Sequence, residues 1–132
     1  MVTDTDTKDT DTKDTGAASM ITWVYCHDLV ETAAFYEDVL GLPLWRDAGA
    51  ARIYQAGGDA LIGVCRAFED RVVNPSGGMI TLLREDVDGW YDRLLAKGAK
   101  LRGTPEKIEQ FGIYSFFCED PNGYVIEVQT FL

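Results

Sequence analysis

Glu127 is the residue of this sequence whose surroundings most need a chemical explanation. It stands in the apolar run Tyr124-Val125-Ile126-Glu127-Val128, directly after Asp120-Pro121-Asn122-Gly123. Proline at the second and glycine at the fourth position of this stretch predict a tight turn, and the β-branched residues that follow predict a strand. A carboxylate inside such a strand is costly to bury unless it is paired or faces a ligand. Glu127 is therefore predicted either to line a cavity or to pair with a donor such as Arg52 or Tyr25.

Few other residues are candidates for chemistry. His27 is the single histidine, and it lies between an apolar run and Asp28, where a surface or capping role is expected. The cysteines Cys26, Cys65 and Cys118 are an odd number at no metal-ligand spacing, each in or beside an apolar run. Buried free thiols are the simpler interpretation, and they favour a cytoplasmic protein.

Length and charge exclude several classes of function. A chain of 132 residues is predicted to form one domain with its own hydrophobic core. No apolar run approaches the ~20 residues of a membrane span. A net charge of -10 argues against nucleic acid as a partner, because that binding depends on Lys and Arg contacts to phosphate. Residues 1–19 repeat Thr5-Asp6-Thr7-Lys8-Asp9 and have no large apolar side chain after Val2, so they predict a disordered acidic tail.

One order of elements occurs twice in residues 20–132. The first half predicts a strand at 21–26, a helix at 29–40 that follows Asp28 and ends at Gly41, and a hairpin of 52–55 with 60–65. The second half predicts a strand at 79–83, a helix between Asp86 and Gly98, a short strand at 100–102, a loop at 103–112, and a hairpin of 114–118 with 124–129. This pattern predicts an α+β fold of two tandem βαβββ units, about 20–68 and 79–132, joined by a linker at 69–78.

The duplicated sequence resembles the vicinal oxygen chelate superfamily, which includes glyoxalase I, extradiol dioxygenases, fosfomycin-resistance enzymes and bleomycin-resistance binding proteins. The likeness is carried by Asp28-Leu29 with Phe35-Tyr36 and Val39-Leu40-Gly41-Leu42, by Leu94-Leu95-Ala96-Lys97-Gly98, and by Asp120-Pro121-Asn122-Gly123 with Ile126-Glu127-Val128. The resemblance implies that the strands of the two units curl into a cupped mixed sheet. It also implies a homodimer, since members of this family usually pair two chains.

The resemblance further implies four metal-ligand positions on the first and last strands of the units, filled by His, Gln or Glu in the metal-dependent members. The matching positions here hold Ile21, Gly63 or a neighbour of it, Met79, and Glu127. One carboxylate does not hold a catalytic divalent ion against water. We therefore expect no metal and no other cofactor, and a divalent-metal lyase or dioxygenase is the least favoured function.

Strand alternation predicts which side chains line the cup, because every second residue of a strand faces the same side. The expected ligand-binding residues are Trp23, Tyr25, Tyr54, Met79, Ser115, Phe117 and Glu127. An aromatic and aliphatic lining with a few polar groups suits a small organic molecule. The same aromatic residues would also be typical of an ordinary core, and a structural pairing of Glu127 is as well supported as a ligand role.

Two functional classes remain open. The first is a metal-independent binding protein that holds an aromatic or otherwise flat organic ligand in an apolar cup. The second is a cofactor-independent isomerase, lyase or cyclase in which Glu127 is the general base and Tyr25 or Ser115 stabilises a developing oxyanion. We favour binding, because catalysis needs a second positioned group that the sequence does not identify.

Overall fold

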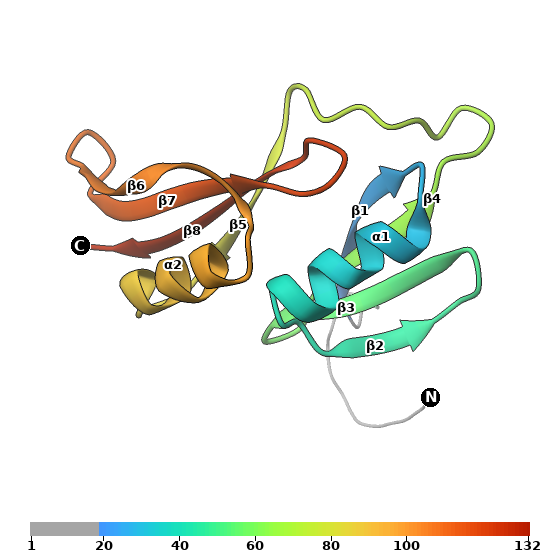
Figure 1. The fold of residues 1–132 in the computed structure, drawn as a ribbon, viewed down its shortest axis with the longest axis horizontal. Helices are drawn as coiled ribbons and strands as arrows, with labels where there is room; N and C mark the ends of the chain where they lie inside the picture. Colours follow the sequence, from blue (N-terminus) through green and yellow to red (C-terminus); the bar gives the residue numbers. More distant parts are fainter. Residues whose placement is uncertain (1–18) are drawn as a thin grey trace, which may run out of the picture.

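The computed structural model describes residues 19–132, which form two four-stranded sheets with helical segments packed against them (Figure 1). The predicted disordered tail at residues 1–19 lies outside the described residues, apart from Ser19. No helix in the described part of the chain is long and apolar enough to cross a membrane.

The first unit has its four strands in the order β1-β4-β3-β2, with β1 parallel to β4. Its strands are β1 (Met20–Cys26), β2 (Leu44–Asp47), β3 (Ala51–Gly57) and β4 (Ala60–Arg66). The helix between β1 and β2 begins as α1 (Leu29–Ala34) and continues as the π-helical segment η1 (Phe35–Val39). Asp28 caps this helix by accepting a hydrogen bond from the Glu31 amide at 3.1 Å, as predicted.

The second unit repeats this arrangement in the order β5-β8-β7-β6, with β5 parallel to β8. Its elements are β5 (Met79–Leu83), α2 (Val87–Ala96), β6 (Lys100–Ile108), β7 (Ile113–Glu119) and β8 (Val125–Phe131). Asp86 caps α2 through the Gly89 amide at 2.9 Å. The predicted α+β fold of two tandem βαβββ units is confirmed.

Two edge strands differ from the prediction. β2 was not predicted as a separate strand, because Leu44-Trp45-Arg46-Asp47 is too short to show alternation and becomes extended by pairing with β3. β6 continues through residues 103–108, where a loop was predicted. Its pairing with β7 shifts register between Arg102 and Glu106, and Gly103 has a φ of 78°. Glycine and proline inside an edge strand mark a bulge as readily as a loop, so the local pattern is ambiguous.

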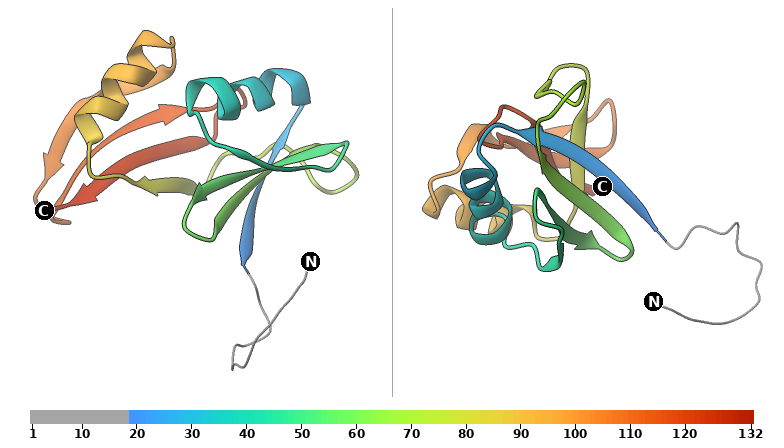
Figure 2. Two further views of the ribbon diagram at one scale, coloured as in Figure 1. Left: turned by 90° about the horizontal axis from the view of Figure 1, so that it is seen from below. Right: turned by 90° about the vertical axis from the view of Figure 1, so that its right-hand side faces the viewer.

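Each sheet has one face covered by helices and one face free of them. Figure 2 shows α1 and α2 on the same side of the two sheets. The helix-covered faces supply the core, whose fully buried side chains include Tyr36, Tyr54, Leu94, Phe116, Ile126 and Val128. Because neighbouring residues of a strand face opposite sides, Phe117 and Glu127 lie on the helix-free face of the second sheet.

The turn between β7 and β8 joins the second unit to the first. The Tyr36 hydroxyl donates to Asp120 Oδ2 at 2.9 Å, and Asn122 Nδ2 donates to Thr32 Oγ1 at 2.9 Å. The His27 amide donates to Asn122 Oδ1 at 3.4 Å. Figure 1 shows this turn reaching toward β1 and α1. Helix α1 is therefore bonded to a turn that lies some ninety residues later in the sequence.

Two arginines connect the units at a second place. Arg84 donates to the carbonyl of Ala56 at 2.9 Å, and Arg93 donates to the carbonyl of Leu40 at 2.8 Å. Their guanidinium carbons lie 4.8 and 4.0 Å from the ring centroid of Trp90, so the indole is in contact with both cations. Side chains of the second unit thus bond backbone carbonyls of the first.

Asp120 is the buried acid of this interface, with 3% of its surface exposed. Its Oδ1 accepts the amides of Asn122 at 2.8 Å and Tyr124 at 2.9 Å, while Oδ2 accepts the Tyr36 hydroxyl. Burial raises the pKa of Asp120, and these hydrogen bonds oppose the rise. Every donor around the carboxylate therefore favours its charged form.

Replacing Tyr36 by phenylalanine should lower the free energy of unfolding by about 1–3 kcal/mol at pH 7, because a buried carboxylate loses a donor. The same change should raise the pKa of Asp120 further. Its folded-state pKa is already above the ordinary value, so the loss should be largest at neutral pH. The loss should shrink as the pH falls through the folded pKa and the carboxyl takes up a proton. Urea unfolding between pH 7 and 5 measures this.

Tyr114→Phe is the matched control, since it removes a hydroxyl whose hydrogen bond to Asp88, 2.6 Å long, lies at the surface. Its cost at neutral pH should be clearly smaller than that of Tyr36→Phe, because water can replace the lost hydrogen bond at the surface. Equal costs for the two variants, or a Tyr36→Phe cost that grows toward acid pH, would show that the Asp120 carboxylate does not depend on Tyr36.

Candidate functional site

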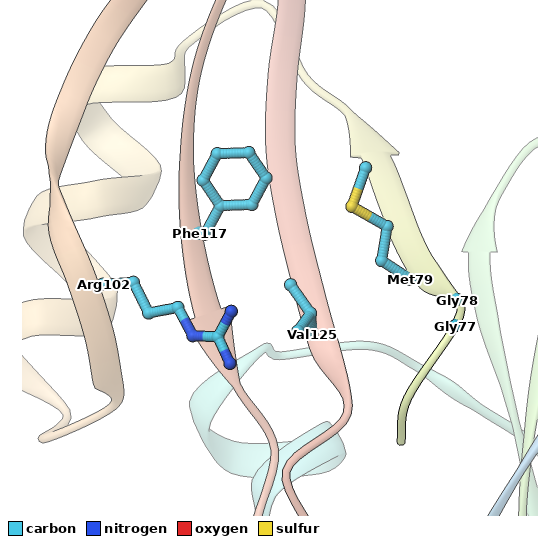
Figure 3. Close-up of a pocket in the computed structure, with 6 residues that line it drawn as sticks. All are labelled: Gly77, Gly78, Met79, Arg102, Phe117 and Val125. Atoms are coloured by element: carbon cyan, nitrogen blue, oxygen red, sulfur yellow. The ribbon is translucent and has the colours of Figure 1, made fainter. Parts of the chain in front are cut away.

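The helix-free face of the second sheet holds two adjoining hollows of about 520 and about 410 Å³. Both are bordered by Met79 and Phe117. The first, shown in Figure 3, is also lined by Gly77, Gly78, Arg102 and Val125. The second is also lined by Ile108, Phe111, Ile113, Glu127, Gln129 and Phe131. The walls are mainly apolar, and the charged groups come from β6 and β8.

Strand register places four side chains in one row across this face. Arg102 of β6 is opposite Phe117 of β7, and Phe117 is opposite Glu127 of β8. Glu127 is in turn opposite Thr81 of β5. Residues that are directly opposite on neighbouring strands face the same side of the sheet. An aromatic ring therefore lies between a cation and an acid.

Glu127 is buried in this row, with 3% of its surface exposed. Thr81 Oγ1 donates to Glu127 Oε1 at 2.8 Å. With its amide turned so that nitrogen faces the acid, Gln129 lies 3.1 Å from both carboxylate oxygens. A carboxylate has about four acceptor positions, so capacity remains for a ligand donor.

The predicted protein partners of Glu127, Arg52 or Tyr25, were wrong. Arg52 lies in the first unit, where it donates to Glu37 at 3.2 Å and is 3.5 Å from Asp47. The structural partners come instead from the neighbouring strand and from β8 itself. This depends on which strands are adjacent, which local sequence does not reveal.

Ser115 is a second buried polar group on the same face. It is 2% exposed and is opposite Gln129 across the β7–β8 ladder. Its hydroxyl has no hydrogen-bond partner among the described residues. A buried hydroxyl without a partner is costly, so this group needs an explanation, although Ser115 itself lines neither hollow.

Trp23 borders a smaller hollow of about 190 Å³ at the junction of the two units. Met79 and Val125 also line it, and they border the first hollow as well. The structure therefore brings together Met79, Phe117 and Glu127, with Ser115 on the same face, and connects Trp23 to them through Met79.

Three predicted ligand-binding residues line none of these hollows: Ser115, which faces the same side of the sheet, Tyr54 and Tyr25. Tyr54 is fully buried on the helix-covered face, where it stacks on Tyr36 at 5.9 Å and donates to Glu37 at 2.7 Å. Burial and that hydrogen bond raise the pKa of Tyr54. The placement of Tyr54 in the cup was wrong, because β3 has the opposite parity from the one assumed. Tyr25 is half-buried near the end of β1 and lines none of the three hollows described above.

Arg102 and Phe111 were missed as site residues. Both lie in the stretch from 100 to 112 that was predicted to be a short strand and a loop. Arg102 reaches the site because β6 pairs with β7. Phe111 reaches it from the turn that follows β6, where it remains 64% exposed. The spacing of Lys100 and Arg102 indicates that both side chains face the same side of a strand. It does not indicate which strand lies next to β6.

The residues present do not fit the divalent metal that the resemblance implies. Within residues 19–132 there is no group of three or more His, Cys, Asp or Glu arranged to hold an ion. At Gly63, a Cβ atom would lie 2.4 Å from ring atoms of Trp23. The indole thus fills the space into which a ligand side chain at this position would project. Ile21 and Met79, which occupy two further positions, offer no oxygen or nitrogen donor.

Solved structures similar to this chain share its fold. Lactoylglutathione lyase from Agrobacterium tumefaciens has a TM-score of 0.69 at 25% identity, over 86% of this chain and 93% of that one. TioX from Micromonospora sp. ML1 has a TM-score of 0.73 at 20% identity, over 88% of this chain and 100% of that one. A glyoxalase/bleomycin resistance protein/dioxygenase from Nocardioides has a TM-score of 0.70 at 19% identity, over 92% and 87% of the two chains. No curated protein sequence matches this chain significantly.

The family match covers both units. The model of the Glyoxalase/Bleomycin resistance protein/Dioxygenase superfamily matches residues 18–128. That range includes both βαβββ units up to the middle of β8, with Glu127. The match agrees with the paired sheets and with the motifs at both helices and at the β7–β8 turn, and on this evidence the chain belongs to the Glyoxalase/Bleomycin resistance protein/Dioxygenase superfamily.

Proposed function

We propose that the protein is a metal-independent small-molecule-binding protein that holds an aromatic or otherwise flat organic ligand on the helix-free face of its second sheet. The observation that carries this proposal is Glu127, a buried acid at the edge of an apolar hollow. Its carboxylate is held by Thr81 and Gln129 and retains acceptor positions. A fixed acceptor among apolar walls is an arrangement typical of small-molecule sites.

The exposed apolar side chains around the hollow favour a flat apolar ligand. Three large apolar side chains border one hollow and are exposed: Met79 at 56%, Phe111 at 64% and Phe131 at 65%. Several large apolar side chains left exposed on one face mark a binding surface more often than an ordinary exterior. Covering them releases about 25 cal/mol for each Å² of apolar surface removed from water. Aromatic rings such as Phe117 favour stacked or edge-to-face contact with another ring.

Loss of the metal positions supports binding without a metal. Three of the four positions implied by the family hold Ile21, Gly63 and Met79, and the Trp23 ring covers Gly63. Glu127, the remaining position, is held by hydrogen bonds to side chains of its own sheet. Recognition by apolar contact and hydrogen bonding is the chemistry that these residues can supply.

The Ser115 hydroxyl supports a second candidate function, that of a cofactor-independent isomerase, lyase or cyclase. Its unpartnered hydroxyl lies on the same face as Glu127, so a base and a hydrogen-bond donor are both present. A proton removed by Glu127 would leave negative charge on the substrate, which the Ser115 hydroxyl could stabilise. Tyr25, the other donor considered, lines none of the described hollows.

We also propose that the protein is a homodimer in which a second copy covers this face. Leu83 is 57% exposed and, like Glu127, lies on the helix-free side of the second sheet. The hollows are open, and their apolar rims continue to Phe131 near the C-terminal end of the chain. A second copy would remove these side chains from water and enclose the ligand.

Metal independence predicts that no divalent ion binds in stoichiometric amount. Equilibrium dialysis against Zn²⁺, Ni²⁺ and Mn²⁺, followed by elemental analysis, should find far less than one ion per chain. Chelator-treated protein should bind aromatic ligands with unchanged affinity. One firmly held ion per chain, or affinity that returns only with metal, would overturn this part of the proposal.

Glu127→Gln should weaken the binding of an aromatic amide such as 4-aminobenzamide by about tenfold, because a charged acceptor is replaced by a neutral one of the same shape. Isothermal titration calorimetry measures the change. Glu106→Gln, the same substitution at an exposed position of β6, should have little effect. Normal binding combined with loss of a chemical conversion seen in the wild type would show that the protein is an enzyme.

The homodimer predicts a sedimentation mass of twice the chain mass of 14.7 kDa. Leu83→Glu should shift the protein toward monomer, because it introduces a charge into the covered face. Val30→Glu is the control, since Val30 on α1 is 76% exposed on the other side of the first sheet. A wild-type monomer at micromolar concentration, or equal dissociation by the two variants, would contradict the proposed interface.

A further inference from the structure

Arg102 brings unused hydrogen-bond donors to the first hollow. Its Nε donates to Glu119 Oε2 at 2.8 Å, and its two terminal nitrogens make no hydrogen bond within residues 19–132. Figure 3 shows the guanidinium extending from β6 across β7 toward Val125, in the hollow that Phe117 also lines. A guanidinium has five N–H donors in a planar fork that matches a carboxylate. Most of those donors remain available to a ligand.

Arg102, Lys100 and Glu119 together carry a net charge of +1. Lys100 Nζ lies 3.3 Å from the other oxygen of Glu119, so two cations share one carboxylate. The hydrogen bond from Arg102 lowers the pKa of Glu119. The whole chain has a net charge of -10. The positive charge at the rim of this apolar hollow therefore contrasts with the acidic chain as a whole, and it favours the binding of an anion there.

The row across the sheet sets the distance between the two strands that carry this cation and the acid. Arg102 and Glu127 lie on strands separated by β7, and neighbouring strands are about 4.8 Å apart, so their backbones are about 10 Å apart. Phe117 lies between them on the same face. The Arg102 side chain reaches across β7 (Figure 3), so its guanidinium is closer to β8 than its backbone is. A molecule of one or two fused rings could then lie against Phe117 with one end toward each charged side chain.

We propose that the ligand of this site is an aromatic acid: a flat ring system with a carboxylate that binds Arg102 at one end and a hydrogen-bond donor, such as an amino or hydroxyl group, that binds Glu127 at the other. This inference rests on the proposed function and specifies its ligand class. The two ends have opposite chemistry, so the site would bind such a molecule in one orientation.

Three small molecules test the two ends separately. The probes are 4-aminobenzoate, its methyl ester, which lacks the anion, and 4-methylbenzoate, which lacks the donor. The two-ring acid 6-amino-2-naphthoate and its corresponding analogues repeat the test at greater length. Calorimetric titration of the full-length protein at pH 7 measures the affinities. Each probe that carries both the carboxylate and the amino group should bind about tenfold more tightly than its ester or its analogue without the amino group.

The variants should remove these preferences one at a time. Arg102→Gln should abolish the preference for 4-aminobenzoate over its ester and leave the affinity for the ester within about twofold. Glu127→Gln should abolish the preference over 4-methylbenzoate. Lys100→Gln is the matched control, since it removes the same charge from a side chain that also contacts Glu119 but lines neither hollow.

The remaining outcomes separate this inference from the proposed function. Equal binding of acid and ester, or a preference for the acid that survives Arg102→Gln, overturns the inference and leaves a binder of neutral flat molecules. An equal loss for Lys100→Gln and Arg102→Gln also overturns it, because a general electrostatic field and not direct contact would then attract the acid. No binding of any probe by the wild type overturns the proposed function together with the inference.

Discussion

The arrangement of the two units depends on how the buried carboxylate of Asp120 is satisfied. Its two oxygens accept two amides of its own turn and the hydroxyl of Tyr36 on the helix of the first unit. A buried acid without these donors would be costly, so the turn and the helix are held together. Asn122 and its bond to Thr32 add a second contact at the same place. These contacts therefore fix the position of the start of β8 relative to the first unit.

Two acids on one short segment consequently have different roles. Asp120 is enclosed by donors on the inner side of the molecule, where it holds the fold together. Glu127, seven residues later, points to the helix-free face, where Thr81 and Gln129 orient it beside an open hollow. Strand alternation separates the core from the site, since Ile126 and Val128 on either side of Glu127 are fully buried under the helices.

The first sheet holds an indole ring at one of the metal-ligand positions that the family resemblance implies. Trp23 of β1 lies over Gly63 of β4, its direct partner in the ladder, and the absence of a side chain at Gly63 gives the indole its place. A histidine or glutamate at Gly63 would displace the ring. An aromatic ring thus occupies the space that a side chain at Gly63 would need, which agrees with the proposed binding of a ligand without a metal.

The sequence by itself determined the two βαβββ units, the caps at Asp28 and Asp86, the β7–β8 turn and the position of Glu127 in its strand, because these depend on local turn, cap and alternation rules. The partners of Glu127, the burial of Tyr54, the length of β6 and the arrival of Arg102 beside Phe117 were decided by tertiary structure. Each of these depends on which strands are adjacent and in what register. That choice is made by the packing of the whole sheet against its helix and by the Asp120 turn, and residues far apart in the chain acquire a common face only when this packing forms.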